Sequence, residues 1–324
     1  MIGATAVRIL GRLGAGAALR TIRRGLRIVV YHHVGSENDL TRHLGCTTPT
    51  DLFHTHVEWL QKNYDIVDLE TVSSGGPLPK RPLLITFDDA YRSFLTEAVP
   101  VLRSFGLPST LFLLTDPVFR NRMVLDNLLS FVIARDPDML STYTRKSGVD
   151  AVRDVLFETI PRGGIPLRDE IYDRLDGKHG HSARELAQEV DLYLRPDDMD
   201  HLHNADVRLA RHTASHLKLP LAENPDRELL AEWSACGLDD RARAFSYPFG
   251  SIADAEATLD AVVAMGIGPL FLVDGCANSP GSRIFFRSSV PTGSIRNLDD
   301  EIEIASMLRR SRRRARIARL ERRL

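Results

Sequence analysis

The stretch Leu83-Leu84-Ile85-Thr86-Phe87-Asp88-Asp89 decides the fold, because it is a short apolar run that ends in two adjacent acids. A continuous run of this kind is typical of a parallel strand that is buried on both faces. Burying charge without a partner is strongly unfavourable, so two carboxylates at the end of such a strand need a function there. Metal ligation by one acid and base chemistry by the other would use both. A helix N-cap at Asp89 is the alternative use.

Apolar runs alternate with helical patterns on both sides of this strand. Further strands are predicted at 28–31, 65–69, 110–114, 206–209, 244–247 and 269–273. Helices are predicted between them, among others at 94–105, 226–236 and 253–265. This alternation predicts an α/β fold with a parallel sheet, either open or closed into a barrel. Functional residues should then lie just after the carboxyl ends of the strands.

Residues 118–204 break the alternation, because they contain helical stretches and no convincing strand. We interpret them as an inserted helical subdomain that covers the strand ends and shapes substrate choice. The predicted organisation is a basic N-terminal segment, a barrel in two parts, the insertion between those parts, and a basic C-terminal helix. Their bounds are 1–27, 28–117 with 205–295, 118–204, and 296–324.

Charge is distributed unevenly, although the net charge is only −1. Residues 1–27 carry six arginines and no acid, and residues 309–324 carry nine arginines beside the single Glu321. The body between them is therefore acidic, which argues against a globular surface for nucleic acid. Ile317, Leu320 and Leu324 form an apolar stripe among the C-terminal arginines, which predicts binding to an anionic membrane surface. A solvated basic helix is the alternative.

The chain shows neither a signal peptide nor a run of about 18 apolar residues. Its three cysteines have no spacing that suggests a disulfide framework or a thiolate metal site. We therefore predict a cytoplasmic protein, with a peripheral position at the membrane as the variant that the basic ends suggest.

Two later motifs indicate what the acid pair at Asp88 and Asp89 does. His212-Thr-Ala-Ser-His216 places two histidines where they can share one divalent ion, and Phe245-Ser-Tyr-Pro-Phe-Gly250 is a strand that ends in a turn. Each motif alone is weak evidence. In this order, with Thr86-Phe87-Asp88-Asp89 first, they resemble the three motifs of the polysaccharide deacetylase family, the NodB-homology domain of carbohydrate esterase family 4. The resemblance covers about residues 28–117 and 205–292.

The resemblance implies a distorted (β/α) barrel with Asp89, His212 and His216 as ligands of a divalent metal, usually zinc. It implies that Asp88 is the general base. Two imidazole nitrogens and one carboxylate are a ligand set that Zn²⁺ accepts, with a position left for water and substrate. Tyr247, Phe249 and Arg287 are expected on the substrate and oxyanion side, with a backbone N–H near Phe249 as the oxyanion donor.

The chain departs from the family pattern at three points. Ala90 stands where a glycine commonly follows the two acids, which predicts strain if that residue needs a positive φ. Ser246 stands where many members have an arginine that orients the base. No histidine occurs after His216, so the usual general acid is absent. We predict that His32, directly after the first strand, supplies the proton while its neighbour His33 turns away.

The sequence thus predicts a metal-dependent deacetylase. Its substrate would be an N-acetylated saccharide or glycolipid, with an O-acetylated one as the second choice. The alternative is a catalytically weak saccharide-binding or scaffold protein that keeps the deacetylase fold.

Overall fold

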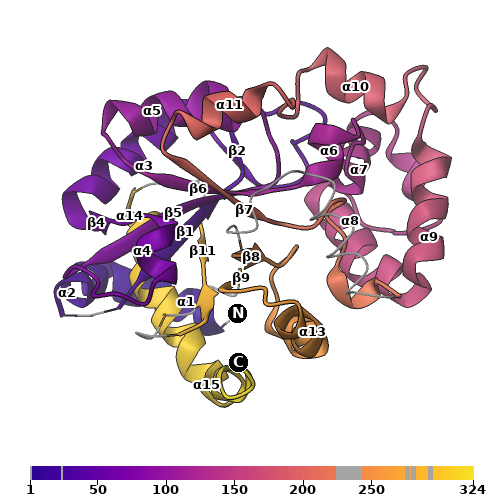
Figure 1. Cartoon of the computed structure of the whole chain (residues 1–324). Helices are drawn as coiled ribbons and strands as arrows, with labels where there is room; N and C mark the ends of the chain where they lie inside the picture. The colour runs from indigo at the N-terminus through magenta and orange to yellow at the C-terminus, as the bar shows by residue number, and fades with distance from the viewer. Residues whose placement is uncertain (1, 23–24, 224–242, 274–277, 279–281, 291–294) are drawn as a thin grey trace.

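The chain folds around one parallel sheet with helices on its flanks (Figure 1). A computed structural model describes residues 2–22, 25–223, 243–273, 278, 282–290 and 295–324. The helix predicted at 226–236 lies outside the described residues. Within those ranges, none of the helices is both long enough and apolar enough to span a bilayer.

The strands of the main sheet are β1 (Arg27–Tyr31), β4 (Asp65–Ile66), β5 (Pro82–Asp88), β6 (Ser109–Leu113), β7 (Val207–Arg211), β8 (Phe245–Ser246), β9 (Leu270–Leu272), β10 (Ile284–Phe286) and β11 (Ser288–Ser289). Their order is β10-β9-β8-β7-β6-β5-β1-β11, with β4 beside β5, and every pairing is parallel. A separate parallel pair consists of β2 (His33–Val34) and β3 (Thr47–Thr48).

The two ends of this strand order meet in the chain at Arg287. β10 pairs with β9 through Ile284 and Leu270, whereas β11 pairs with β1 through Ser288 and Val29. Arg287 is the single residue between β10 and β11. The order of strands therefore returns on itself around one arginine, which fits the predicted distorted barrel.

One face of the sheet gathers side chains from different strands into a single apolar cluster. Its strand members include Ile28, Leu84, Phe112, Ala210, Phe271 and Phe285. Side chains on a strand alternate between faces, so Asp88, four residues beyond Leu84, belongs to the same face at the carboxyl end of β5. The candidate site therefore lies above this cluster, where the barrel prediction expects it.

The strand predicted at 65–69 is shorter than expected. β4 ends at Ile66, and Leu69 already begins the short helix α4 (Leu69–Ser73). The Asp68 carboxylate accepts a hydrogen bond of 2.7 Å from the Thr71 backbone N–H, so it caps this helix and ends the extended segment.

Helices cover the outside of the sheet. Along the chain they are α3 (Thr50–Asn63), the short π-helical η1 (Phe94–Ala98), α5 (Val99–Ser104) and α13 (Ile252–Ala264). Phe53, Val57 and Leu60 of α3 are buried in the core cluster that also holds Val29 and Ile85 of the sheet. This amphipathic packing is what the i, i+4, i+7 spacing of these apolar residues favours.

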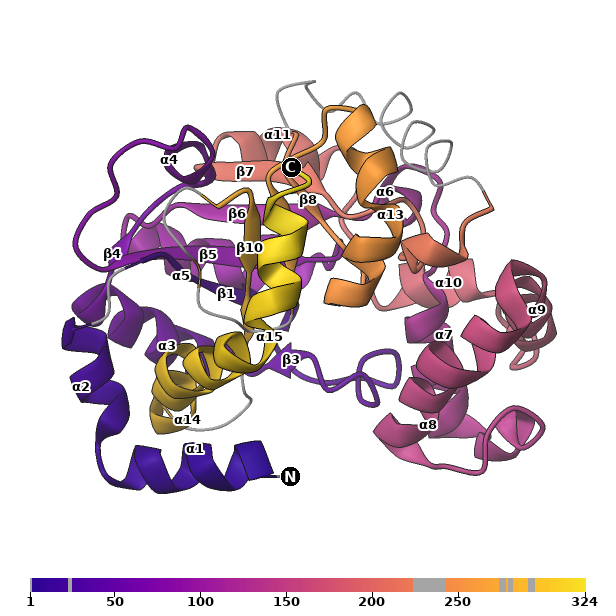
Figure 2. The ribbon, with the colours of Figure 1, turned by 90° about the horizontal axis from the view of Figure 1, so that it is seen from below.

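The segment between β6 and β7 is helical in the described structure, with α7 to α10 grouped on one side of the molecule (Figures 1 and 2). Its helices are α6 (Thr115–Phe119), α7 (Leu125–Arg135), η2 (Pro137–Leu140), α8 (Gly148–Asp154), η3 (Val155–Thr159), α9 (Ile160–Leu175), α10 (Ala183–Glu189) and α11 (Asp198–His203). The division of the chain into a two-part barrel and an insertion stays a prediction.

The N-terminal helices pack against the acidic first part of the C-terminal segment, which in turn contacts the sheet (Figure 2). The N-terminal end forms α1 (Ile2–Arg12) and α2 (Ala15–Ile22). The C-terminal end forms α14 (Ile295–Asp299), η5 (Asp300–Ala305) and α15 (Ser306–Glu321). A buried ion pair joins Arg27 Nε to Glu303 Oε1 at 2.9 Å, and the Tyr64 hydroxyl donates to the same oxygen.

The apolar stripe predicted to face a membrane packs mainly inside the protein. Ile317 and Leu320 are buried in the cluster that holds Leu259 of α13 and Leu270 of the sheet, and Leu324 packs against that cluster. The stripe therefore attaches α15 to α13 and to the sheet. Binding of an anionic membrane stays a prediction that depends on the arginines.

Candidate active site

A buried ion pair holds the first acid of the pair. Arg287 Nη1 donates to Asp88 Oδ1 at 2.5 Å, and Nη2 donates to Oδ2 at 2.6 Å. Arg287 Nη2 also donates to Ser246 Oγ at 2.6 Å. Both charged side chains are at most 2% exposed, so this two-pronged contact fixes the carboxylate plane.

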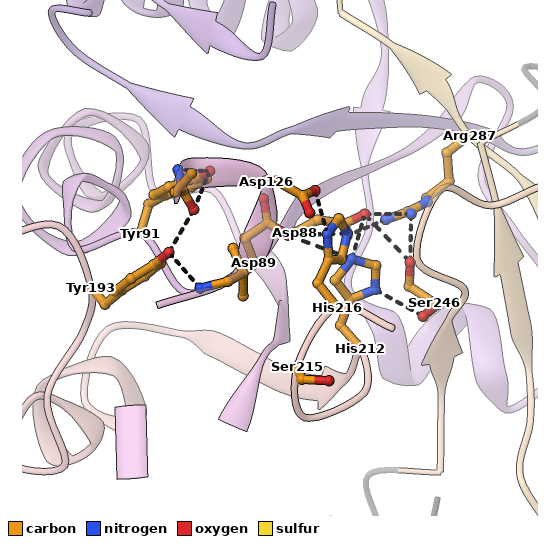
Figure 3. Close-up of polar contacts among 12 residues, drawn as sticks. Asp88, Asp89, Tyr91, Asp126, Tyr193, His212, Ser215, His216, Ser246 and Arg287 are labelled. Carbon is orange, nitrogen blue, oxygen red and sulfur yellow. Dashed lines mark hydrogen bonds and ion pairs between the residues drawn. The ribbon is translucent and has the colours of Figure 1, made fainter. Parts of the chain in front are cut away.

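The second acid faces two histidines. His212 Nε2 lies 3.6 Å from Asp89 Oδ1, and His216 Nε2 lies 3.7 Å from the same oxygen (Figure 3). One ligand atom from each of the three residues can be chosen so that all lie within 4.8 Å of one another. The residues come from the ends of β5 and β7, so the parallel sheet brings distant segments together at one edge.

Each histidine is oriented by a hydrogen bond at its other nitrogen. His212 Nδ1 donates to the Ser246 carbonyl at 2.8 Å, and His216 Nδ1 donates to Asp126 Oδ2 at 2.7 Å. With Nδ1 engaged in this way, the Nε2 atom of each ring faces Asp89. Nε2 is therefore the ring atom that each histidine could offer to a metal ion.

Burial and neighbouring charges determine the protonation of these groups. Burial raises the pKa of Asp88, but the Arg287 guanidinium outweighs it and holds the pKa below its usual range. Burial lowers the pKa of His212 to about 4. For His216, burial lowers the pKa, but the Asp126 and Asp89 carboxylates outweigh this and raise it to about 9. Asp88 is therefore ionised at neutral pH.

The turn after β5 brings both acids to one site. Asp88 lies on the face of the sheet that carries the apolar cluster of Leu84. The next residue on a regular strand would point to the opposite face. Asp89 instead has a φ of 70°, which turns its carboxylate toward the histidines. The strain predicted for Ala90 is wrong, because the positive φ falls on Asp89 and Ala90 is a buried residue without one. Aspartate tolerates this conformation better than most residues.

The third motif lacks the arginine that the resemblance leads us to expect. An arginine from a distant segment, between β10 and β11, contacts Asp88 in its place. Ser246 occupies the expected position, and its hydroxyl lies 3.4 Å from Asp88 Oδ2. Arg287 reaches the same carboxylate from between β10 and β11 and also contacts Ser246. From the sequence, Arg287 is expected on the substrate side, whereas the structure places its guanidinium on the Asp88 carboxylate. Its side chain is fully buried and therefore acts on Asp88.

The two remaining residues predicted on the substrate side differ in position. The Phe249 ring lies 4.5 Å from the His216 ring, so Phe249 borders the site. Tyr247 is fully buried beside Phe245, and its hydroxyl lies 3.1 Å from Thr258 Oγ1 of α13. The structure therefore places the Tyr247 side chain in the core and away from the site, because alternation along β8 turns it to the opposite face from Ser246.

The adjacent histidines after β1 have different environments. His33 is buried, its ring packs edge-on against Tyr91 at 5.4 Å, and burial lowers its pKa to about 4. His32 is partly exposed. Among the influences on the pKa of Asp88, burial raises it most, and Arg287, His212 and also His32 lower it. His32 therefore lies within electrostatic range of Asp88.

The helical segment contributes to the site directly. Asp126 stands in the first turn of α7, and its neighbour Asn127 donates to the Leu40 carbonyl at 2.9 Å and accepts from the Tyr193 hydroxyl at 2.5 Å. The Leu194 backbone N–H donates to the Ala90 carbonyl at 2.8 Å, right after the acid pair. Both ends of the helical segment therefore contact the edge of the sheet at which the site lies.

Comparison with known proteins assigns the class. Residues 75–268, more than half of the chain, match the family model described as polysaccharide deacetylase. The chain belongs to the polysaccharide deacetylase family. The family resemblance seen in the motifs is thereby confirmed.

Individual relatives match over shorter stretches. YxkH of Bacillus subtilis, which carries the same family name, is 33% identical over 94 residues, 28% of this chain and 32% of YxkH. The poly-beta-1,6-N-acetyl-D-glucosamine N-deacetylase of Escherichia coli K12 is 31% identical over 90 residues, 26% of this chain and 13% of that enzyme. The matches therefore span a third or less of the relatives' own lengths.

Solved structures show the same fold. The Streptococcus pyogenes deacetylase PplD in complex with acetate superposes with a TM-score of 0.53 at 17% identity, over 86% of this chain and 98% of PplD. The predicted fold, a parallel-sheet α/β structure of the deacetylase type, is confirmed by this likeness.

Proposed function

We propose that the protein is a metal-dependent hydrolase that removes acetyl groups from N-acetylated saccharides. The observation that carries this proposal is the convergence of Asp89, His212 and His216 beside the ionised, arginine-paired Asp88. Family membership supports the reaction class, and the E. coli relative, by its name, acts on poly-beta-1,6-N-acetyl-D-glucosamine. N-acetylglucosamine oligomers are therefore the first substrates to test, ahead of glycolipids and O-acetylated sugars.

The residues of the cluster fit a divalent cation. Asp89 Oδ1 is buried and has no hydrogen-bond partner among the described residues, although it faces two imidazole nitrogens. A buried carboxylate oxygen without a donor is costly, and a cation would compensate it. Two nitrogens and one oxygen match zinc, and they leave room for further ligands.

The low basicity of Asp88 explains why it would need such an ion. Its pKa is held below the usual range by Arg287, so it is a poor acceptor for a proton of ordinary water. A bound divalent cation supplies Lewis acidity, which polarises the acetyl carbonyl and lowers the pKa of water from about 15.7 toward about 7. Asp88 then takes the proton as water adds to the carbonyl carbon.

The other half of the reaction breaks the bond between the carbonyl carbon and the nitrogen. We propose that a backbone N–H in the turn at Phe249 donates to the developing oxyanion, because this turn borders His216. The leaving nitrogen requires a proton, and His32 is the proposed donor because it lies within electrostatic range of Asp88. Acetate and a free amine are the products.

The His32→Gln variant should lower kcat while the metal content stays intact. A general acid must hold its proton, so the fall of activity on the alkaline side of the pH profile should disappear in this variant. Acetate release measured across the pH range, with metal analysis of the same samples, checks this. Wild-type turnover in His32→Gln across the range would remove His32 from the mechanism.

Asp126 is expected to position His216 as a ligand. Its hydrogen bond at 2.7 Å holds the proton on Nδ1, and loss of such a partner typically lowers metal affinity 10- to 100-fold. Asp126→Ala should therefore weaken zinc binding by this factor in competition with a chelator, and Asp126→Glu should recover part of it. Asp138→Ala, on η2 of the same helical segment, is the control. Equal zinc affinity in Asp126→Ala and in the parent would show that the contact does not position the ligand.

Acetate release from N-acetylglucosamine oligomers, with zinc or cobalt added, tests the proposed function. Release that depends on added metal supports the hydrolase. Saturable oligosaccharide binding without release would instead favour the catalytically weak saccharide-binding protein. A cytoplasmic location, with a peripheral position at the membrane as its variant, stays a prediction.

A further inference from the structure

A row of aromatic rings leads from the proposed metal ligands to the surface. The Phe249 ring contacts the His216 ring at 4.5 Å, and the Phe157 ring meets the Phe249 ring at 5.0 Å in a nearly perpendicular arrangement. Phe157 belongs to η3 of the helical segment, so the row joins two parts of the chain that are far apart in sequence. Phe157 has no part in the proposed catalytic steps.

Phe157 is exposed although it is large and apolar. Its exposed fraction is 40%, whereas Val155 and Leu156 of the same turn are buried. The Phe157 ring is therefore not needed to fill the core. An exposed aromatic side chain that continues a row of rings from a buried site suggests a surface for a ligand that is partly apolar.

A cation lies over one face of the exposed ring. Lys218 Nζ is 5.8 Å from the centre of the Phe157 ring, and Lys218 follows His216 by two residues. Lys218 Nζ also lies 3.5 Å from Asp254 Oδ1, so the ammonium group is held near the ring by a second contact. The surface thus combines an aromatic face with a hydrogen-bond donor.

We infer that Phe157, Phe249 and Lys218 form a saccharide subsite that binds a sugar residue next to the one that loses its acetyl group. A pyranose ring has an apolar C–H face, which can pack on an aromatic ring, and hydroxyl groups at its rim, which can accept from an ammonium group. The inference rests on the proposed substrate class. It makes the helical segment a determinant of substrate length.

Truncation of the exposed ring should therefore raise KM more than it lowers kcat. Phe157→Ala removes a contact made equally in the ground state and the transition state, so KM for an N-acetylglucosamine tetramer should rise about tenfold and kcat should change little. Phe157→Trp keeps an aromatic face and should retain a KM close to that of the parent. Phe119→Ala, at a side chain of α6 with 36% exposure, is the matched control and should leave KM unchanged.

A binding measurement separates the subsite from the chemistry. In an Asp88→Asn background, the indole of Phe157→Trp should change its fluorescence in a saturable way when the tetramer is added. The background protein, which keeps the two native tryptophans, serves as the reference. This readout does not depend on acetate release.

The two possible failures can be told apart. Saturable fluorescence change in the Asp88→Asn background, together with no acetate release by the metal-loaded parent protein, would support the subsite and contradict the proposed reaction. Acetate release with a KM for the tetramer that is unchanged in Phe157→Ala, or raised equally in Phe119→Ala, would overturn the subsite and leave the reaction standing.

Discussion

Asp88→Asn is expected to abolish nearly all acetate release while bound metal stays at the parental level. The amide keeps the shape of the side chain but cannot take a proton, and general-base catalysis typically contributes about 10²- to 10⁴-fold. Acetate release should fall by at least the lower of these factors. The metal should remain because Asp88 is engaged by Arg287 and is not part of the proposed ligand set. Acetate assays and elemental analysis on one preparation check both halves of this expectation.

The same variant also perturbs a buried ion pair, so its fold must be measured. Leaving one member of a buried pair without its counter-charge typically costs about 3–5 kcal/mol of stability. Asparagine still offers an oxygen to Arg287, which should keep the loss below that range. The double variant Asp88→Asn/Arg287→Met removes both charges and is the control for stability. Parental activity in folded Asp88→Asn would exclude Asp88 as the base.

His216→Ala is expected to empty the metal site and with it to remove acetate release. Only three described side chains make up the proposed ligand set, so loss of one imidazole leaves two ligands. Elemental analysis after dialysis should find little metal in this variant. His181→Ala, at an exposed histidine of the helical segment, should keep the parental content. Stoichiometric zinc in His216→Ala would show that the ligand assignment is wrong.

Most of the fold could be predicted because its signals are local. Buried parallel strands are continuous apolar runs, and the runs at 28–31, 83–87 and 110–114 correspond to β1, β5 and β6. Asp88 and Asp89 could be singled out because they stand where a buried apolar run ends. His212 and His216 could be named because the order of the three motifs resembles that of the polysaccharide deacetylase family. The strand at 65–69 was predicted too long, since a side-chain cap at Asp68 ends it.

The parts of the site that could not be predicted depend on contacts between distant segments. Nothing next to Arg287 in the sequence indicates that its guanidinium meets Asp88, because the contact exists only where the strand order returns on itself. Tyr247 was expected at the site because of its motif, but the two-residue period of β8 turns it into the core. Asp126 appears as an ordinary first-turn acid of a helix. The one indication in the sequence that Asp126 lies near the site is that the helical segment begins just after a strand ends.

The most direct test of the proposed metal-dependent deacetylation is a metal reconstitution experiment with an N-acetylglucosamine oligomer as substrate. The protein is stripped with a chelator, zinc is added back in steps, and acetate release and bound zinc are measured together. We expect no acetate release from the stripped protein and a rise in release that levels off at one zinc per chain. Release at an undiminished rate from protein that holds no metal would contradict this expectation.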